Sequence, residues 1–396
     1  MQNTTRRQFL GNSLASGAAA LLAWPPDPFL LDASFAAALQ EPLDGPFPGG
    51  RLVRTLLFED RKRGQRRNVT YGAGLDGRLR LDLAELTPRT LITPNEKFYI
   101  RTRCPARIDF SRPWKIRVHG RVARPLDLSM KELTPLVEPM GVHLLECSGS
   151  GTSGLISAAN WSGIAIEKIL DKCRARRDAS RVLISGFDEH EGVKPSSNEP
   201  GASWIFTFEQ LKRAGAFLAT KMNARPLPKD HGYPIRLVMP GWYGCTCIKW
   251  LNELEFVDDK ARATVHMREF AGRTHQDGEP RLARDYEPAT IDLSAMPVRV
   301  EKWSVNGKLI YRVVGIIWGG DEPSDALAIR FGRNPRYVRV ENCEYSDTRT
   351  WSLWSHTWRP TRPGRYRIRL RIDDAGNRTR RLDSHYYQRV VKIAEV

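Results

Sequence analysis

The chain has 396 residues, of which 41% are hydrophobic and 27% are charged, a balance typical of a folded soluble protein with room for two domains. Its formal net charge of +17 favours an anionic substrate, cofactor or partner. The basic residues are spread along the whole sequence without a helix-turn-helix, zinc-finger or RNA-binding motif, so nucleic acid is excluded from the expected partners.

The N-terminus has the pattern of an export signal. Two arginines, Arg6 and Arg7, precede a short apolar run at residues 11–24, and residues 36–38 are small enough for cleavage. Paired arginines followed by Phe and Leu resemble a twin-arginine signal, which belongs to a route that exports folded proteins. Residues 1–38 are therefore predicted to be a signal peptide and the mature protein to be periplasmic or otherwise exported. The alternative is a basic, unstructured N-terminus.

The cysteines suggest neither a disulfide scaffold nor a haem. The chain has six of them, with no Cys-x-x-Cys pair and no Cys-x-x-Cys-His for haem attachment. Cys245 and Cys247 are close in sequence but lack the second half of a zinc site. A zinc or copper site built from these two and a histidine is kept as an alternative. Most of the cysteines are expected to be small buried hydrophobic residues.

A regular α+β domain is predicted over residues 96–260, after an irregular surface segment at 39–95 that is rich in proline, glycine and arginine. Ser129 and Glu132 form a capping box that predicts a short helix. Apolar residues at helical spacing predict a second helix near 164–175, and a capped helix is expected from 207 to 215. Strands are expected at residues 114–119, 144–147, 182–184, 235–239 and 248–257.

A second, all-β domain is predicted over residues 291–396. Residues 261–290 are charged and poor in aliphatic side chains, which indicates a linker. Beyond them, runs rich in Val, Ile, Tyr and Trp are separated by turn residues, at the spacing of an immunoglobulin-like sandwich. These runs are at residues 297–303, 309–318, 336–345, 350–358, 364–373 and 386–394.

Cys147 is the first candidate site residue. It follows a predicted strand and precedes a loop, Ser148-Gly149-Ser150-Gly151, whose glycines permit close backbone approach to a ligand. A thiolate is a suitable donor for a soft metal centre, and surrounding positive charge is expected to lower the pKa of this thiol. The alternative for any single cysteine is simple burial.

Two further segments carry candidate residues. His231, Arg236 and Lys249 occur among glycines and form a plausible cradle for a pyrophosphate, unless they belong to a turn-rich connection whose charges face solvent. Arg101 follows an aromatic-rich segment and is suited to clamp an oxyanion in bidentate fashion, the alternative being a surface arginine on an edge strand.

Taken in this order, the segments resemble the sulfite oxidase family. The likeness rests on Pro94-Asn95-Glu96, Glu146-Cys147-Ser148-Gly149, the stretch from Asn223 to Trp250, and the Trp and Gly motifs of the C-terminal region, and it spans roughly residues 90–396. It implies a fold with a molybdopterin-binding domain followed by an immunoglobulin-like domain that dimerises.

The resemblance also implies a molybdenum-molybdopterin cofactor with Cys147 as the only protein ligand to the metal. Arg101 is then the substrate-facing arginine. The cofactor-binding residues implied are Phe98, Arg103, Cys147, Ser148, Gly149, Asp188, His231, Arg236, Gly244 and Lys249.

Some positions depart from the family pattern. The loop after Cys147 lacks the arginine that sulfite oxidases usually have there, Pro200 replaces a pocket tyrosine, and Asp321 stands near where the C-terminal domain would offer a cation. These losses weaken the case for sulfite itself.

The sequence thus predicts an exported oxidoreductase that performs two-electron oxygen-atom transfer on sulfite or a related sulfur compound. An external electron acceptor, such as a soluble cytochrome, and a homodimer are expected. Two alternatives remain open: a molybdopterin-dependent reductase of sulfoxides or other oxidised groups, and a non-catalytic exported binding protein.

Overall fold

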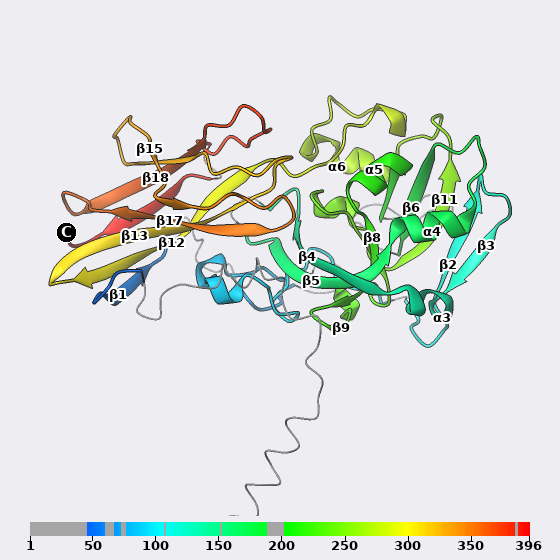
Figure 1. The fold of residues 1–396 in the computed structure, drawn as a ribbon, viewed down its shortest axis with the longest axis horizontal. Coiled ribbons are helices and arrows are strands. Elements are labelled where there is room, and N and C mark those ends of the chain that lie inside the picture. Colours follow the sequence, from blue (N-terminus) through cyan, green and yellow to red (C-terminus); the bar gives the residue numbers. More distant parts are fainter. Residues whose placement is uncertain are drawn as a thin grey trace, which may run out of the picture. The chain divides into compact units, whose positions relative to one another are not determined.

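The computed structural model in Figure 1 describes residues 46–59, 67–72, 77–106, 108–150, 153–187, 202–384 and 387–396. The expected signal peptide, Asp188 and Pro200 lie outside these ranges. In the described part of the chain, no helix is long and apolar enough to cross a membrane.

One mixed sheet has the strand order β3-β2-β11-β6-β7. In β2, Ile116 and Val118 are fully buried and alternate with more exposed residues, which confirms the predicted half-buried strand. β11 pairs parallel with β2 and antiparallel with β6. The bounds are β2 Lys115–Gly120, β3 Leu126–Ser129, β6 Arg181–Gly186, β7 Ala202–Thr207 and β11 Leu251–Val257.

A second, antiparallel sheet has the order β10-β8-β5-β4, with β9 added beside β8. β4 ends at Glu146, so Cys147 is the first residue after it. β5 and β8 were not predicted, because strands buried on both faces lack polar alternation. The bounds are β4 Glu138–Glu146, β5 Ile156–Ala165, β8 Phe217–Met222, β9 Arg225–Pro226 and β10 Arg236–Val238.

The helices are short, and α3, α4 and α5 begin within two residues of the positions predicted from the sequence. α3 (Met130–Leu133) has the expected capping box at Ser129, and α5 (Phe208–Arg213) is capped by Thr207. α4 (Ile166–Cys173) buries Ile166, Ile169 and Cys173. Single 3-10 turns occur at Leu83–Glu85, Pro88–Thr90, Thr134–Leu136, Lys229–His231 (η5), Gly244–Thr246 (η6), Ala271–Arg273 (η7) and Ala283–Asp285.

Residues 261–290 do not run as an extended connection. They contain α6 (Val265–Phe270), whose cap is Thr264. Ala263, Met267, Phe270 and Ala271 belong to the same hydrophobic cluster as the two sheets described above. These positions recur at helical spacing, a signal that the low aliphatic content of the segment concealed. The segment is therefore part of the hydrophobic core of the first domain.

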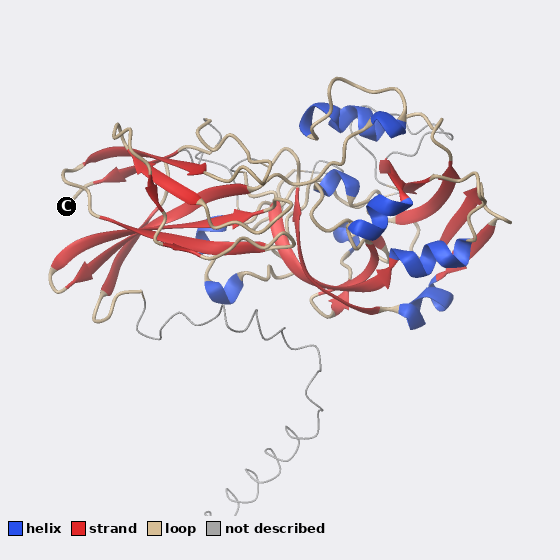
Figure 2. Cartoon of the chain, turned by 45° about the horizontal axis from the view of Figure 1, so that its top comes forward, coloured by secondary structure: helices blue, strands red, loops and turns tan. Residues whose placement is uncertain are grey.

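The strands of the C-terminal region, together with β1, form two further antiparallel sheets, which Figure 2 draws in red like every other strand. One has the order β1-β12-β13-β17-β16, the other β15-β14-β18-β19, and side chains of both belong to one hydrophobic cluster. The bounds are β1 Arg51–Leu56, β12 Ser294–Val305, β13 Lys308–Trp318, β14 Leu327–Phe331, β15 Val338–Arg339, β16 Asn342–Cys343, β17 Trp351–Trp358, β18 Gly364–Ile372 and β19 Arg389–Ile393.

The strand predictions for this region hold in most places. β12, β13, β17, β18 and β19 fall on predicted runs, whereas the run at 336–345 divides into β15 and β16 and β14 was not expected. Asn306 and Gly307 both have positive φ, as the tight turn between β12 and β13 requires. β1 comes from the segment expected to be irregular and pairs along the edge of β12.

Candidate active site

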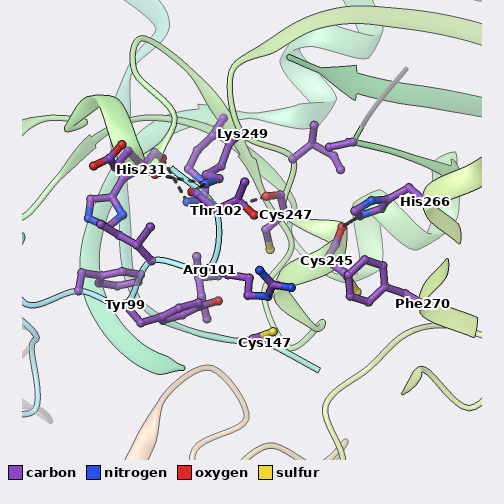
Figure 3. Close-up of a pocket in the computed structure, with 18 residues that line it drawn as sticks. Tyr99, Arg101, Thr102, Cys147, His231, Cys245, Cys247, Lys249, His266 and Phe270 are labelled. Atoms are coloured by element: carbon purple, nitrogen blue, oxygen red, sulfur yellow. Dashed lines mark hydrogen bonds between the residues drawn. The ribbon is translucent and has the colours of Figure 1, made fainter. Parts of the chain in front are cut away.

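A cavity lies next to the C-terminal end of β4. We call it the central cavity. Figure 3 shows Arg101 reaching into it, with His231 and Lys249 on one side and Cys245, His266 and Phe270 on the other. Seven of the residues singled out from the sequence line this cavity: Phe98, Arg101, Cys147, His231, Arg236, Gly244 and Lys249.

Cys147 is held at the cavity by the turn that follows β4. Its backbone N–H donates to the carbonyl oxygen of Leu155 at 3.0 Å, and its own carbonyl oxygen accepts from the N–H of Ser150 at 2.8 Å. The side chain is a buried, free thiol. This turn fixes the sulfur at the edge of the cavity.

The expectation of a lowered thiol pKa was wrong. Burial raises the pKa of Cys147, and the backbone N–H of Gly149 with the charges of Arg101 and Arg273 offsets only part of that effect. Without a bound cation, Cys147 is therefore a neutral thiol at neutral pH. It becomes a thiolate only when a metal replaces its proton.

One wall of the central cavity carries fixed cations. Arg236 donates to the carbonyl oxygens of His231 at 3.2 Å and Cys247 at 3.0 Å, so its guanidinium has one orientation. Lys249 donates to the carbonyl oxygens of Thr102 and Asp230, and its ammonium lies 4.2 Å from the centroid of the Trp250 ring. One buried and one half-buried cation, both held by carbonyl dipoles, are suited to bind a phosphate.

His231 differs from its neighbours in charge. Burial, assisted by the charges of Lys249 and Arg236, lowers its pKa to about 3. The imidazole is therefore neutral at physiological pH, and it packs edge-on against Phe98 with ring centroids 5.4 Å apart. His231 can act as a hydrogen-bonding group toward a ligand but not as a cation.

Gly244 is required by close packing beside Cys147. A Cβ at this position would lie 2.7 Å from the hydroxyl oxygen of Tyr99 and 3.1 Å from the carbonyl oxygen of Glu146. Gly232, with φ +103°, leaves similar room beside Arg236 and Lys249. Gly244 itself lines the cavity, and Gly232 packs against two residues that line it.

Three of the predicted cofactor residues do not line the central cavity. Arg103 pairs instead with Asp230, at 3.3 Å from Nε to Oδ2, and Asp230 lines the wall. Ser148 and Gly149 follow Cys147 in the turn; Ser148 is half-buried and Gly149 is exposed. Asp188, the fourth, falls outside the described residues.

Opposite the cationic wall, the cavity is closed by Ala202, Cys245, His266 and Phe270. The sequence signalled Cys245 only as part of the alternative zinc or copper site, and it gave no signal for Ala202, His266 and Phe270. Nε2 of His266 donates to the carbonyl oxygen of Cys245 at 2.8 Å, which ties α6 to η6. Cys245 and Cys247 are free thiols, and the described residues contain no group of three or more His, Cys, Asp or Glu that fits a metal ion. The structure thus lends no support to a zinc or copper site.

Asp321 does not reach the cavity. It is exposed, and its N–H donates to Oδ1 of Asn377 at 3.0 Å. The cation that the C-terminal region brings toward Cys147 is Arg380, which forms two hydrogen bonds of 2.7 Å to the carboxylate of Glu146. That arginine is paired with Glu146 and does not line the cavity.

Comparison with known proteins gives consistent matches. Residues 102–265 match the oxidoreductase molybdopterin binding domain. Mitochondrial sulfite oxidase of Rattus norvegicus is 25% identical over 307 residues, covering 66% of this chain and 56% of that protein. Sulfite oxidase of Gallus gallus is 28% identical over 208 residues, with 48% and 44% covered. Nitrate reductase (NADPH) of Mycosarcoma maydis is 26% identical over 221 residues, with 47% and 22% covered.

Among solved structures, the sulfane dehydrogenase SoxCD from Paracoccus pantotrophus matches with a TM-score of 0.60, covering 94% of this chain and 95% of that chain. At 16% identity this likeness concerns the fold alone. The chain spans about half the length of the sulfite oxidases it matches.

Proposed function

Because the chain belongs to the sulfite oxidase family of molybdopterin-dependent oxidoreductases, we propose that it binds one molybdenum cofactor through Cys147 and catalyses oxygen-atom transfer on a small substrate in the central cavity. The observation that carries the proposal is that Cys147, His231 and Lys249, from distant parts of the sequence, line one cavity. If Cys147 were only a buried hydrophobic residue, it would have no reason to share a cavity with His231 and Lys249.

The donor set of the cavity fits this cofactor. Cys147 offers a sulfur donor of the kind that soft metal centres prefer. Arg236 and Lys249 offer fixed positive charge for a phosphate, and His231 offers a neutral hydrogen-bonding ring. Gly244 lines the same cavity and lets its backbone pack against Tyr99 and the Glu146 carbonyl, next to Cys147.

In this proposal, each of these residues has its own role. The cofactor, when bound, supplies two-electron oxygen-atom transfer at molybdenum. Cys147 gives up its thiol proton on binding the metal. Arg236 and Lys249 hold the phosphate of the pterin, and Arg101 orients an anionic substrate within reach of Cys147. Arg103 acts indirectly, because it holds Asp230 in the wall.

Sulfite or a related sulfur compound is the proposed substrate class, on the strength of the sulfite oxidase matches. The match to nitrate reductase supports testing the reverse direction, the reduction of a sulfoxide or another oxidised group. Assays with both an electron-accepting and an electron-donating dye separate the two.

Export, electron transfer and dimerisation remain proposals from the sequence. Residues 1–38 support a twin-arginine signal and a periplasmic location. The net charge of +17 supports an acidic external electron acceptor such as a soluble cytochrome. The two antiparallel C-terminal sheets around one core support an immunoglobulin-like domain, through which the family resemblance implies a homodimer.

The decisive experiment measures molybdenum and pterin in protein from a host that makes the cofactor. The wild type should contain about one molybdenum per chain, and Cys147→Ser should retain pterin but lose turnover, because serine is a harder and less readily ionised donor. Cys343→Ser, a half-buried cysteine in the C-terminal region, is the control and should behave as wild type. Wild-type protein without molybdenum or pterin would favour a non-catalytic binding protein.

A further inference from the structure

Arg273 lies beside the turn that carries Cys147. Its Nη1 is 3.8 Å from the place a Cβ would take on Gly149. Its guanidinium carbon is 5.6 Å from the centroid of the Phe270 ring, and Phe270 lines the central cavity. Arg273 is exposed and does not itself line the cavity, but it lies beside two residues of the cavity's surroundings, Gly149 and Phe270.

The backbone conformation at position 149 does not require a glycine. Its φ is not among the positive values of this chain, so other residues could adopt it. The missing side chain instead leaves open the space that faces Arg273. A larger residue at 149 would separate that arginine from the turn.

Arg101 and Cys147 line the same cavity, and Nη1 of Arg273 lies beside Gly149, two residues after Cys147. Across the described ranges of the chain, neither arginine forms an ion pair with a carboxylate. Two cations from segments far apart in the sequence are thus available to one anion near the sulfur.

The wall next to these arginines is apolar and polarisable. Phe270 and Cys245 line it, and both are held by His266, whose ring centroid is 4.8 Å from that of Phe270 and whose Nε2 bonds to the Cys245 carbonyl. Sulfite has only oxygens around its sulfur and gains nothing from such a wall. An anion with an organic substituent would bury apolar surface against it.

We propose that Arg101 and Arg273 bind the anionic head of an organic sulfinate while its organic group packs on Phe270 and Cys245. This names the substrate class for the proposed function and rests on it. The sulfur lone pair of the sulfinate forms the new S–O bond, with the oxygen derived from water: RSO2⁻ + H2O gives RSO3⁻, two protons and two electrons. Two equivalents of a one-electron acceptor such as ferricyanide take up the electrons.

The test uses molybdenum-loaded protein, with ferricyanide as acceptor and benzenesulfinate or sulfite as substrate. Arg273→Gln should raise KM for benzenesulfinate about 10-fold and change kcat much less, because it removes a charge-assisted contact to the bound anion. Arg273→Lys should recover part of the loss. Arg268→Gln, an exposed arginine of α6, is the matched control and should leave KM unchanged.

A second variant tests the apolar wall. Phe270→Leu should raise the ratio of KM for benzenesulfinate to KM for sulfite several-fold, because only the aromatic substrate packs on the ring. Calorimetric binding of benzenesulfonate, which does not turn over, should weaken in parallel. This binding measurement does not depend on catalysis.

The outcomes separate this inference from the proposed function. If the protein contains molybdenum and oxidises sulfite, yet the wild type and Arg273→Gln bind benzenesulfonate equally well, the inference alone is overturned. Protein that lacks molybdenum and oxidises neither substrate overturns the proposed function. If the molybdenum-free protein also fails to bind benzenesulfonate, the inference is overturned as well. If it binds benzenesulfonate and the Arg273→Gln variant binds it more weakly, the anion site is supported.

Discussion

Glu146, the residue before Cys147, is bound on both carboxylate oxygens by Arg380 of the C-terminal region, at 2.7 Å each. Glu146 is 1% exposed, and Nε1 of Trp318 donates to its Oε2 at 2.9 Å. Arg380 also contacts the hydroxyls of Tyr243 and Tyr387. The strand end that presents Cys147 is therefore fixed by an arginine that lies 234 positions after Glu146 in the chain.

Arg380→Met should lower the free energy of unfolding by about 3–5 kcal/mol, because it leaves a buried carboxylate without its counter-charge. Denaturant unfolding followed by tryptophan fluorescence measures this. Arg381→Met is the control: both side chains of its ion pair with Asp383 are exposed, so the loss should be small by comparison. Equal losses in the two variants would contradict a special role for the buried pair.

Lys249→Met should reduce the molybdopterin content at least several-fold while the fold is retained, because the variant keeps the length of the side chain but loses the charge facing the cavity. Pterin fluorescence after acid release, with circular dichroism on the same sample, gives both quantities. Lys260→Met, an exposed lysine after β11, should retain full content. Full content in Lys249→Met would remove this residue from the phosphate site.

Gly244→Ala should destabilise the protein by about 1–3 kcal/mol, because the new methyl group meets the Tyr99 hydroxyl and the Glu146 carbonyl. Gly272→Ala is the matched control, since no atom lies within 4 Å of its added Cβ. Thermal unfolding of the two variants, compared with wild type, reads out the difference. A Gly244→Ala protein as stable as Gly272→Ala would show that the turn has room to relax.

His143 should make the fold sensitive to acid. Burial lowers its pKa to about 4 from 6.5, and the charge of Arg349 acts in the same direction. The unfolded chain therefore binds a proton below pH 6.5 that the folded chain binds only near pH 4, so stability falls as pH falls through this window. The loss is on the order of 3 kcal/mol.

His143→Gln should flatten that part of the pH profile while keeping a donor for the Met140 carbonyl, which His143 contacts at 2.8 Å. The free energy of unfolding, measured by denaturant at several pH values between about 4 and 7, checks the slope. His231 and His356 also have lowered pKa values, and they contribute equally to the pH dependence of the wild type and of His143→Gln. Parallel profiles for variant and wild type would exclude His143 as the source.

The central cavity shows which features of the site can be predicted from short sequence motifs. Cys147 at a strand end, the capping boxes at Ser129 and Thr207, and the glycines around His231 are all visible as short motifs, because they follow from hydrogen bonds within a few residues. The pKa of Cys147 was predicted in the wrong direction, because burial depends on elements that pack over the sulfur from elsewhere in the chain.

The sequence alone determined the type of most elements, their order and the residues that mark the family, since these depend on local periodicity and on motifs. Only the tertiary structure decided that α6 closes the cavity, that Arg273 stands beside Gly149, and that Arg380 neutralises Glu146. Each of those contacts joins segments far apart along the chain, and the free energy that selects them comes from packing and desolvation in the assembled core, which no short stretch of sequence contains.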